Sequence, residues 1–154
     1  MHYWLMKTEP SNFSIDDLAR APQRRTCWDG VRNFQVRNML RDEFAEGDLA
    51  FMYHSSCELP GIVGVMEVLT RGYPDPTALD AHHANHDPAS TADKPRWYMV
   101  DVCLKQRFSS VVSLDELRSH GSGALRDLQI LKRGNRLSIT PLSEREWRFI
   151  LALR

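Results

Sequence analysis

Two apolar runs in the middle of the chain constrain the fold more than any other feature. The run DLAFMYHS covers residues 48–55, and the run GIVGVMEVL covers residues 61–69. Both have the length and the β-branched and aromatic content that are typical of strands. The intervening SSCELP is short enough to join neighbouring antiparallel strands, so the two runs predict the centre of a β-sheet.

Three further segments predict strands around this centre. The run HYWLMK at residues 2–7 is short, aromatic and aliphatic. The run RWYMVDVCLKQRF at residues 96–108 alternates, so that two valines and a leucine share one face. The run NRLSIT at residues 135–140 predicts the last strand.

Helices are predicted between the strands by apolar spacing and by N-cap residues. Ser14 caps a short helix over IDDLARA, and serines in the same S-x-x-D/E pattern begin helices at Ser113 and Ser143. The run GALRDLQIL predicts one more short helical piece. A longer helix is predicted from Arg32 to the stop at Gly47. Its apolar stripe consists of Val36, Met39, Leu40 and Phe44.

The order of these elements predicts an α+β fold, because strands and helices do not alternate as regular βαβ units. A small mixed sheet curled into a β-barrel, with several short helices against its outside, fits the pattern best. A chain of 154 residues is expected to form a single domain over residues 1–154. Residues 72–95 hold Pro, Asp, His and Ala without a sustained period, which predicts one long surface loop.

Composition restricts the compartment and the partners. The formal net charge is zero, so any affinity for nucleic acid is expected to come from a local patch or a pocket rather than from a general basic excess. No apolar run is long enough to span a membrane, and we expect no secretory signal and no membrane partner. The cysteines Cys27, Cys57 and Cys103 are odd in number and widely spaced, which favours buried thiols in a reducing cytoplasm.

One group of residues raises the question of a metal site. His82, His83 and His86 lie beside Asp80 and Asp87 in the predicted loop. A metal site needs ligands that are held in fixed geometry with supporting partners. We therefore interpret this group as a solvated polar loop and expect neither a metal nor another cofactor.

A nucleophile is considered at the sequence HSSC, where His54 precedes Ser55. Adjacent positions on a strand point to opposite faces, so these two side chains are poorly placed as base and nucleophile. The sequence has no G-x-S-x-G elbow, no P-loop and no G-x-G-x-x-G motif. These observations favour a binding module over an enzyme.

Aromatic residues beside small hydrogen-bonding groups give a third possibility. Trp4 and Trp147 lie in apolar runs and are expected in the core. Trp28 differs, because polar residues and a glycine follow it. An extruded nucleobase needs flat apolar walls and a few fixed donors and acceptors, and stacking on an aromatic ring contributes about 1–3 kcal/mol per base. Trp28 is therefore predicted to be a pocket wall.

Five blocks of the sequence together resemble the EVE domain family, in its stand-alone bacterial form. These blocks are YWLMKTEPSNFSIDDL, WDGVRNFQVRNMLR, GDLAFMYHSSCELPGIVGVMEV, YPDPT and RWYMVDV. The resemblance implies a PUA-like fold, which is a small barrel flanked by helices, and kinship with YTH domains, which hold methylated adenine in an aromatic cage. It further implies a non-enzymatic reader of a modified base in DNA or RNA, with modified cytosines as one ligand class.

The resemblance also implies which residues surround the ligand, carried over position by position. They are Lys7, Thr8, Trp28, Asn33, Tyr53, His54, Ser55, Pro60, Gly61 and Trp97. Thr8 stands where the family pattern has serine and keeps the hydroxyl, whereas Phe34 stands where the pattern has tyrosine and loses one. No ligand contact is assigned to Phe34 on this basis.

The chemistry of the residues after Trp28 agrees with such a pocket. Gly30 allows the backbone to turn close to a ligand, and the start of the predicted helix offers unsatisfied N–H groups. The Asn33 amide has both a donor and an acceptor with which to read a base edge. Arg32 and Arg37 are expected to hold a flanking phosphate.

Three hypotheses follow, and the first is favoured. The first is a reader of a modified nucleobase in DNA, in RNA or as a free modified nucleotide. The second is a general RNA-binding module whose contacts are Arg37, Arg41, Lys132, Arg133 and Arg136. The third is a small nucleotide-acting enzyme with His54 as acid or base. The sequence leaves open the modification, the polymer and the oligomeric state.

Overall fold

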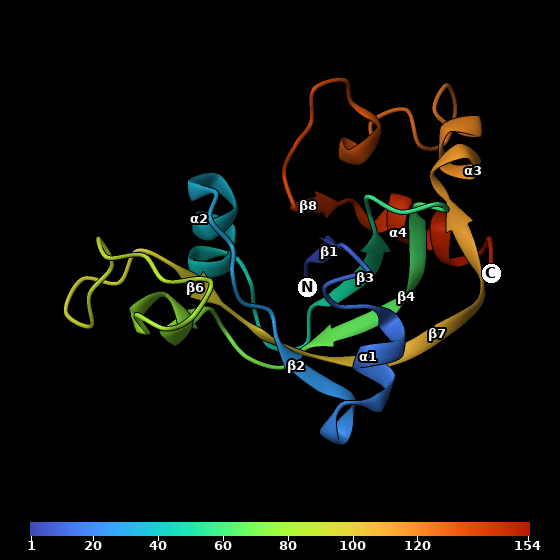
Figure 1. Ribbon diagram of the computed structural model, residues 1–154. Helices are drawn as coiled ribbons and strands as arrows, with labels where there is room; N and C mark the ends of the chain where they lie inside the picture. Colours follow the sequence, from blue (N-terminus) through green and yellow to red (C-terminus); the bar gives the residue numbers. More distant parts are fainter.

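The computed structural model describes all residues, 1–154, and its main feature is a strongly curved six-stranded sheet (Figure 1). The strand order is β2-β7-β4-β3-β1-β8. The sheet is mixed, because β1 runs parallel to β3 whereas the other neighbours are antiparallel. It curls into a half-barrel with short helices around it, which confirms the predicted α+β class and architecture.

The boundaries of the elements are as follows. The strands are β1 (Tyr3–Thr8), β2 (Arg25–Cys27), β3 (Leu49–His54), β4 (Gly61–Val68), β5 (Tyr73–Pro74), β6 (Tyr98–Met99), β7 (Asp101–Ser113) and β8 (Ile139–Leu142). The α-helices are α1 (Ile15–Arg20), α2 (Phe34–Asp42), α3 (Leu114–Ser119) and α4 (Glu144–Leu151), and the 3-10 helices are η1 (Pro22–Arg24), η2 (Pro76–Leu79) and η3 (Gln129–Leu131). None of the helices combines the length and the apolar character that crossing a bilayer requires.

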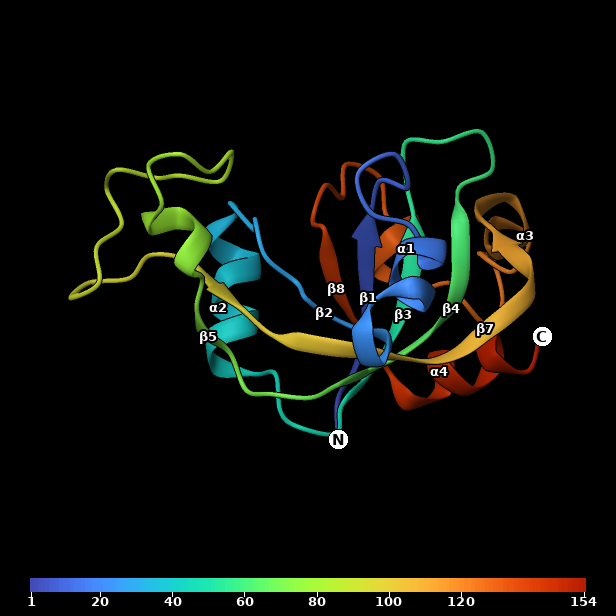
Figure 2. The same cartoon turned by 60° about the horizontal axis from the view of Figure 1, so that its bottom comes forward.

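The curvature of the sheet comes largely from β7, which spans 13 residues (Figure 2). The pairing of β7 with β4 shifts register at two places, between Ile62 and Gly64 and between Val65 and Met66. Such bulges bend a strand and increase its twist. β4 pairs with β7 along Val102–Ser113, and β2 pairs with the start of β7, Asp101–Cys103, on its other edge.

Both faces of the sheet are covered, which explains why the central strands are almost wholly apolar. On β1, Trp4 and Met6 point into a core beneath α1 and α2, whereas Leu5 points into a second core against α3 and α4. In the second core, Phe51 stacks on Trp147 with ring centroids 3.9 Å apart. The side chains of Trp4 and Trp147 are both buried, as the sequence predicts.

Local capping patterns predict several helix starts correctly. Ser14 with Asp17, and Ser143 with Glu146, form complete capping boxes at α1 and α4. The Ser113 side chain accepts a hydrogen bond from the backbone N–H of Glu116 at α3.

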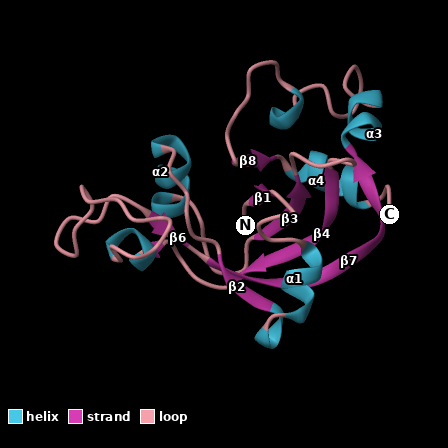
Figure 3. Cartoon of the chain, viewed as in Figure 1, coloured by secondary structure: helices cyan, strands magenta, loops and turns pink.

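Other predicted boundaries are corrected by the structure. The helix predicted from Arg32 to Gly47 begins at Phe34, since the Asn33 side chain caps it, and ends at Asp42, so that Phe44 lies beyond it. The piece predicted as a helix over residues 123–131 consists of turns and η3. The predicted surface loop 72–95 is mostly loop in Figure 3, but β5 and η2 interrupt it. The strand predicted over residues 96–108 is broken at Val100, because β6 pairs with β5.

A buried carboxylate joins the N-terminus of β1 to the turn before β3. Asp48 is only 1% exposed and accepts hydrogen bonds from the Trp4 indole Nε1–H at 3.0 Å and from the backbone N–H groups of His2 and Ala45. The Trp4 ring is in turn stacked on Phe44, with centroids 4.2 Å apart. The three donors satisfy the Asp48 carboxylate, which offsets the free-energy cost of burying its charge.

Asp48→Ala is expected to lower the free energy of unfolding by about 3 kcal/mol, because three donors lose their acceptor together. Urea denaturation followed by tryptophan fluorescence measures this. Asp93→Ala, in an exposed loop, is the matched control and should change the free energy by less than about 0.5 kcal/mol. Equal stability of the two variants would contradict the role assigned to Asp48.

Candidate functional site

A cavity of about 580 Å³ opens at the C-terminal end of β1. Three parts of the chain enclose it: the end of β1 with the segment that follows it, the connection from β2 towards α2, and the tip of the loop after η2. Its volume is within the range of small-molecule and base pockets. The lining residues are Lys7, Thr8, Asn12, Phe13, Thr26, Cys27, Trp28, Asp29, Gly30, Ala84 and Asn85.

Trp28 forms one wall of this cavity and also belongs to the core beneath α1 and α2. Only 8% of the residue is exposed. Its backbone N–H donates to the carbonyl of Val100 at 2.8 Å, which extends the pairing of β2 with β7 by one residue and fixes the indole. The indole is therefore a rigid, largely desolvated surface that is partly open to the cavity.

The buried carboxylate of Asp75 holds together two of the segments that enclose the cavity. It accepts hydrogen bonds from the Gly30 N–H at 3.0 Å and from both the N–H and the hydroxyl of Thr77, and the Arg32 guanidinium lies 3.6 Å away. The Thr77 hydroxyl accepts from the amide of Asn85. Asp75 thereby joins the β2–α2 connection to the segment after β5.

Gly30 is required at this position for two reasons. Its φ of +76° is in the left-handed region, which side chains with a Cβ adopt only at a cost. A Cβ on this residue would also lie 3.2 Å from the amide nitrogen of Asn85. The glycine therefore allows the Asn85 side chain to close the cavity.

Two charged groups in the cavity wall are held in environments that disfavour their charges. Burial lowers the pKa of the Lys7 ammonium, which has neither a hydrogen-bond partner nor a carboxylate within ion-pair distance. Desolvation, followed by the negative charge of Asp75, raises the pKa of the Asp29 carboxyl. An ammonium without a partner and a carboxyl with a raised pKa that line one cavity are typical of a binding site.

Comparison of the sequence with known proteins places the chain in a family. The EVE domain model matches residues 2–153. Thymocyte nuclear protein 1 of Rattus norvegicus is 42% identical over 167 aligned positions, which cover 99% of this chain and 73% of that protein.

This chain belongs to the EVE domain family. Among solved structures, a protein of Pseudomonas syringae is 45% identical, with a TM-score of 0.91 and 98% of each chain covered. Human THYN1 in complex with DNA that contains 5-methylcytosine is 40% identical, with a TM-score of 0.93 over 99% of this chain and 97% of that chain. The resemblance stated from the sequence motifs is thus confirmed.

Of the residues predicted to surround a ligand, this EVE domain brings three into the cavity wall. Lys7, Thr8 and Trp28 line it directly. The Thr8 hydroxyl donates to the carbonyl of Phe13 at 2.9 Å, so it retains its capacity to accept. Arg32 lies at the rim, where its guanidinium donates to the backbone carbonyl of Asn85.

Two more predicted residues, Asn33 and Trp97, do not line the cavity. The Asn33 side-chain oxygen is engaged as the N-cap of α2, where it accepts from the Val36 N–H at 3.0 Å. Trp97 is buried, and its indole N–H donates to Asp87 at 2.6 Å.

The predicted residues around the β3–β4 turn are not among those that line the cavity. The Tyr53 ring is buried in the core against α3 and α4, where burial raises its pKa to about 12. His54 Nε2 accepts from the Ile15 N–H at 3.1 Å, and burial lowers the pKa of the ring. Gly61 is explained by packing, since a Cβ there would lie 2.3 Å from the Val112 carbonyl oxygen.

Ser55 and Pro60 complete this group. The Ser55 N–H donates to the carbonyl of Thr8, which continues the pairing of β1 with β3. The Pro60 carbonyl accepts from the N–H of Leu114 at the start of α3. The backbones of both residues serve the sheet and the α3 junction.

Sequence reasoning missed several residues of the cavity. They are Asn12, Phe13, Thr26, Cys27, Asp29, Ala84 and Asn85. The position of Asp29 directly after Trp28 is a signal that could have identified it. No local signal points to Asn85, which reaches the site through the folding of a long, aperiodic segment.

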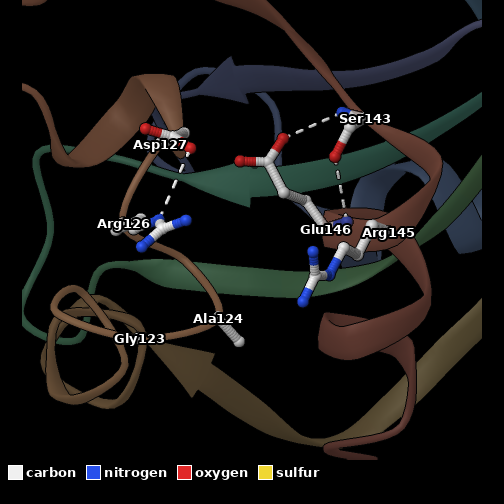
Figure 4. A pocket seen from close by; sticks show the side chains of 7 residues that line it. All are labelled: Gly123, Ala124, Arg126, Asp127, Ser143, Arg145 and Glu146. Atoms are coloured by element: carbon white, nitrogen blue, oxygen red, sulfur yellow. Dashed lines mark hydrogen bonds and ion pairs between the residues drawn. The ribbon is translucent and has the colours of Figure 1, made fainter.

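A second cavity, of about 470 Å³, is shown in Figure 4. Glu146 and Ser143 form the capping box of α4, although the second carboxylate oxygen of Glu146 is buried without a hydrogen-bond partner. Arg126 lies 3.9 Å from the adjacent carboxylate of Asp127. It has no aromatic wall. Elsewhere in the chain, no group of three or more His, Cys, Asp or Glu side chains is positioned to hold a metal ion.

The unpaired ammonium of Lys7 predicts a gain in stability when it is removed. Lys7→Met should raise the urea midpoint at pH 7, because the desolvated charge is replaced by an apolar side chain of similar length. The pKa of Lys7 is lowered in the folded state, so the cost is present at neutral pH and declines as the pH rises towards the ordinary lysine range. The difference in midpoint should therefore shrink at pH 10.

The exposed residue Lys94 supplies the control for this measurement. Lys94→Met should leave the midpoint unchanged at both pH values. A lower midpoint for Lys7→Met than for the wild type at pH 7 would show that the ammonium is not under electrostatic strain.

Proposed function

We propose that this EVE domain is a non-enzymatic reader that binds a modified nucleobase of DNA or RNA in the Trp28 cavity. The observation that carries the proposal is the combination of a rigid indole wall with the unpaired charges of Lys7 and Asp29. A flat apolar face and a few fixed polar groups are what an extruded base requires. No phosphate-binding surface of high net charge is needed.

The chemistry of the wall matches a methylated cytosine. The exocyclic amino group of cytosine is a donor and carboxylates accept from it, which is a suitable role for Asp29. The ring nitrogen and carbonyl of the base are acceptors, and the Lys7 ammonium is suited to donate to them. The Trp28 and Phe13 rings offer apolar surface for the base and its methyl group.

The human relative THYN1, with 40% identity and the same fold, is known in complex with DNA that contains 5-methylcytosine. This supports a modified pyrimidine as the first ligand to test. The alternative in which His54 acts as acid or base is less well supported, since its Nε2 is already engaged with the Ile15 N–H.

The first experiment is an anisotropy titration with short oligonucleotides of one sequence. They carry cytosine, 5-methylcytosine, 5-hydroxymethylcytosine or N6-methyladenine at a central position, as DNA and as RNA. We expect tighter binding of at least one modified form, and a loss of about tenfold in Trp28→Phe, because the smaller ring reduces the stacking surface.

Trp147→Phe is the matched control, since Trp147 is equally buried but belongs to the other core. It should lose stability without losing the preference for the modified base. Equal, weak affinity for all oligonucleotides, unchanged in Trp28→Phe, would overturn the proposal. A steep salt dependence with that result would favour the general RNA-binding module instead.

The raised pKa of Asp29 predicts a pH dependence of binding. If the ionised carboxylate accepts from the cytosine amino group, affinity falls as the pH is lowered through this pKa, at a higher pH than for an ordinary aspartate. Asp29→Asn should reduce affinity about tenfold at pH 7, through loss of a charge-assisted hydrogen bond, and remove this part of the pH dependence. The control is Asp93→Asn, which should show the wild-type pH profile, and an unchanged profile in Asp29→Asn would contradict the assignment.

A further inference from the structure

An exposed aromatic ring lies outside the cavity at the start of α2. Phe34 is 48% exposed, which is unusual for a phenylalanine. One side of its ring is stacked on Trp97, with centroids 4.8 Å apart and planes 24° from parallel. The pair therefore forms a flat surface whose lower ring is buried and whose upper ring reaches solvent.

Three arginines lie over this pair of rings. The guanidinium carbons of Arg37 and Arg96 lie 4.9 Å and 5.4 Å from the Phe34 ring centroid. The guanidinium carbon of Arg32 lies 5.2 Å from the Trp97 ring. Arginine planes stack on nucleobases and donate to phosphate, so the cluster combines both kinds of contact.

The cluster is held in place by hydrogen bonds. The Trp97 indole N–H donates to Asp87, and Arg96 lies 3.8 Å from the same carboxylate. The Arg37 guanidinium donates to the Arg96 carbonyl at 2.7 Å and has no carboxylate within ion-pair distance. Arg37 is thus a positioned cation whose charge is not neutralised.

The cluster is continuous with the cavity through Arg32. This side chain lies over Trp97 and donates to the backbone carbonyl of Asn85, which lines the cavity. Figure 1 shows α2, β6 and the segment before β6 together on one side of the sheet, and Figure 2 shows the same grouping. A strand whose modified base enters the cavity would therefore pass close to Phe34.

We propose that Phe34, Arg37 and Arg96 form a second subsite, which binds the nucleotide adjacent to the base in the cavity. The neighbouring base stacks on Phe34 and the intervening phosphate accepts from Arg37. The subsite rests on the proposed function, and it deepens that function by making a polynucleotide, rather than a free nucleotide, the ligand. It also gives Phe34 a stacking role, which needs the ring but not the hydroxyl of the tyrosine that the family pattern has at this position.

The test is Phe34→Leu, which keeps an apolar cover over Trp97 but removes the flat ring. Anisotropy titrations use single-stranded DNA and RNA oligonucleotides with either 5-methylcytosine or cytosine at one position. Phe34→Leu should weaken binding of both forms by about tenfold, because the stacking contact does not depend on the modification. The ratio of the two affinities should stay at the wild-type value, and Phe34→Trp should restore binding.

Arg37→Gln provides a second, independent measurement. It should weaken binding several-fold at low salt and reduce the slope of log affinity against log salt by about 0.7 for a single strand, which corresponds to the loss of one phosphate contact. Leu59→Ala is the matched control, since Leu59 is 56% exposed and lies in the β3–β4 turn. It should bind like the wild type in every titration.

The outcomes separate the subsite from the cavity. Wild-type affinity in Phe34→Leu, or a weakening that Phe34→Trp does not restore, would overturn the subsite and identify the ring as a cover for Trp97. A ratio that falls to one in Phe34→Leu would also overturn it. If the wild type shows no preference for modified bases but Phe34→Leu and Arg37→Gln still weaken binding, the subsite stands and the proposed function fails.

Discussion

The candidate site depends on one buried carboxylate, that of Asp75. Only 2% of this residue is exposed, and its oxygens accept from the Gly30 N–H and from two donors of Thr77, with the Arg32 guanidinium nearby. These contacts hold the β2–α2 connection against the segment after β5. Without them, the Asn85 side chain would not close the cavity, and Arg32 would not be fixed at its rim.

Four charged groups serve two different purposes in this EVE domain. Asp48 and Asp75 are satisfied by several donors, so their burial fixes the positions of neighbouring segments. Lys7 and Asp29 lack such partners, and the pKa of each is shifted towards the neutral form. The first pair stabilises the fold, whereas the second pair gives the cavity a donor and an acceptor for the ligand proposed above.

The proposed division between a cavity and an adjacent stacking surface reconciles nucleic-acid binding with zero net charge. In the proposed function, the cavity distinguishes the base by shape and by two oriented groups. The arginines beside Phe34 supply a local positive charge, of which Arg37 is the member without an acidic partner. A protein built in this way has no need of the basic excess that general phosphate binding requires.

The sequence by itself determined those features that arise from contacts between near neighbours. The apolar runs at residues 2–7, 48–55 and 61–69 located three strands of the sheet, and the capping patterns at Ser14 and Ser143 located two helix starts. The polar surroundings of Trp28 marked it as a residue unlike the core tryptophans, and the structure places it in the cavity wall. The family motifs located Lys7 and Thr8 as well.

The tertiary structure alone decided which of the remaining candidates meet. Tyr53 and Trp28 are both aromatic and both beside polar residues, but the register of the sheet directs Tyr53 into the core against α3 and α4. The hydrogen bond between Gly30 and Asp75 joins residues 45 positions apart. Periodicity and capping extend over only a few residues, so they carry no information about such a contact. The cavity exists because the folded chain brings distant segments together. The charged groups Lys7 and Asp29 meet in its wall for the same reason.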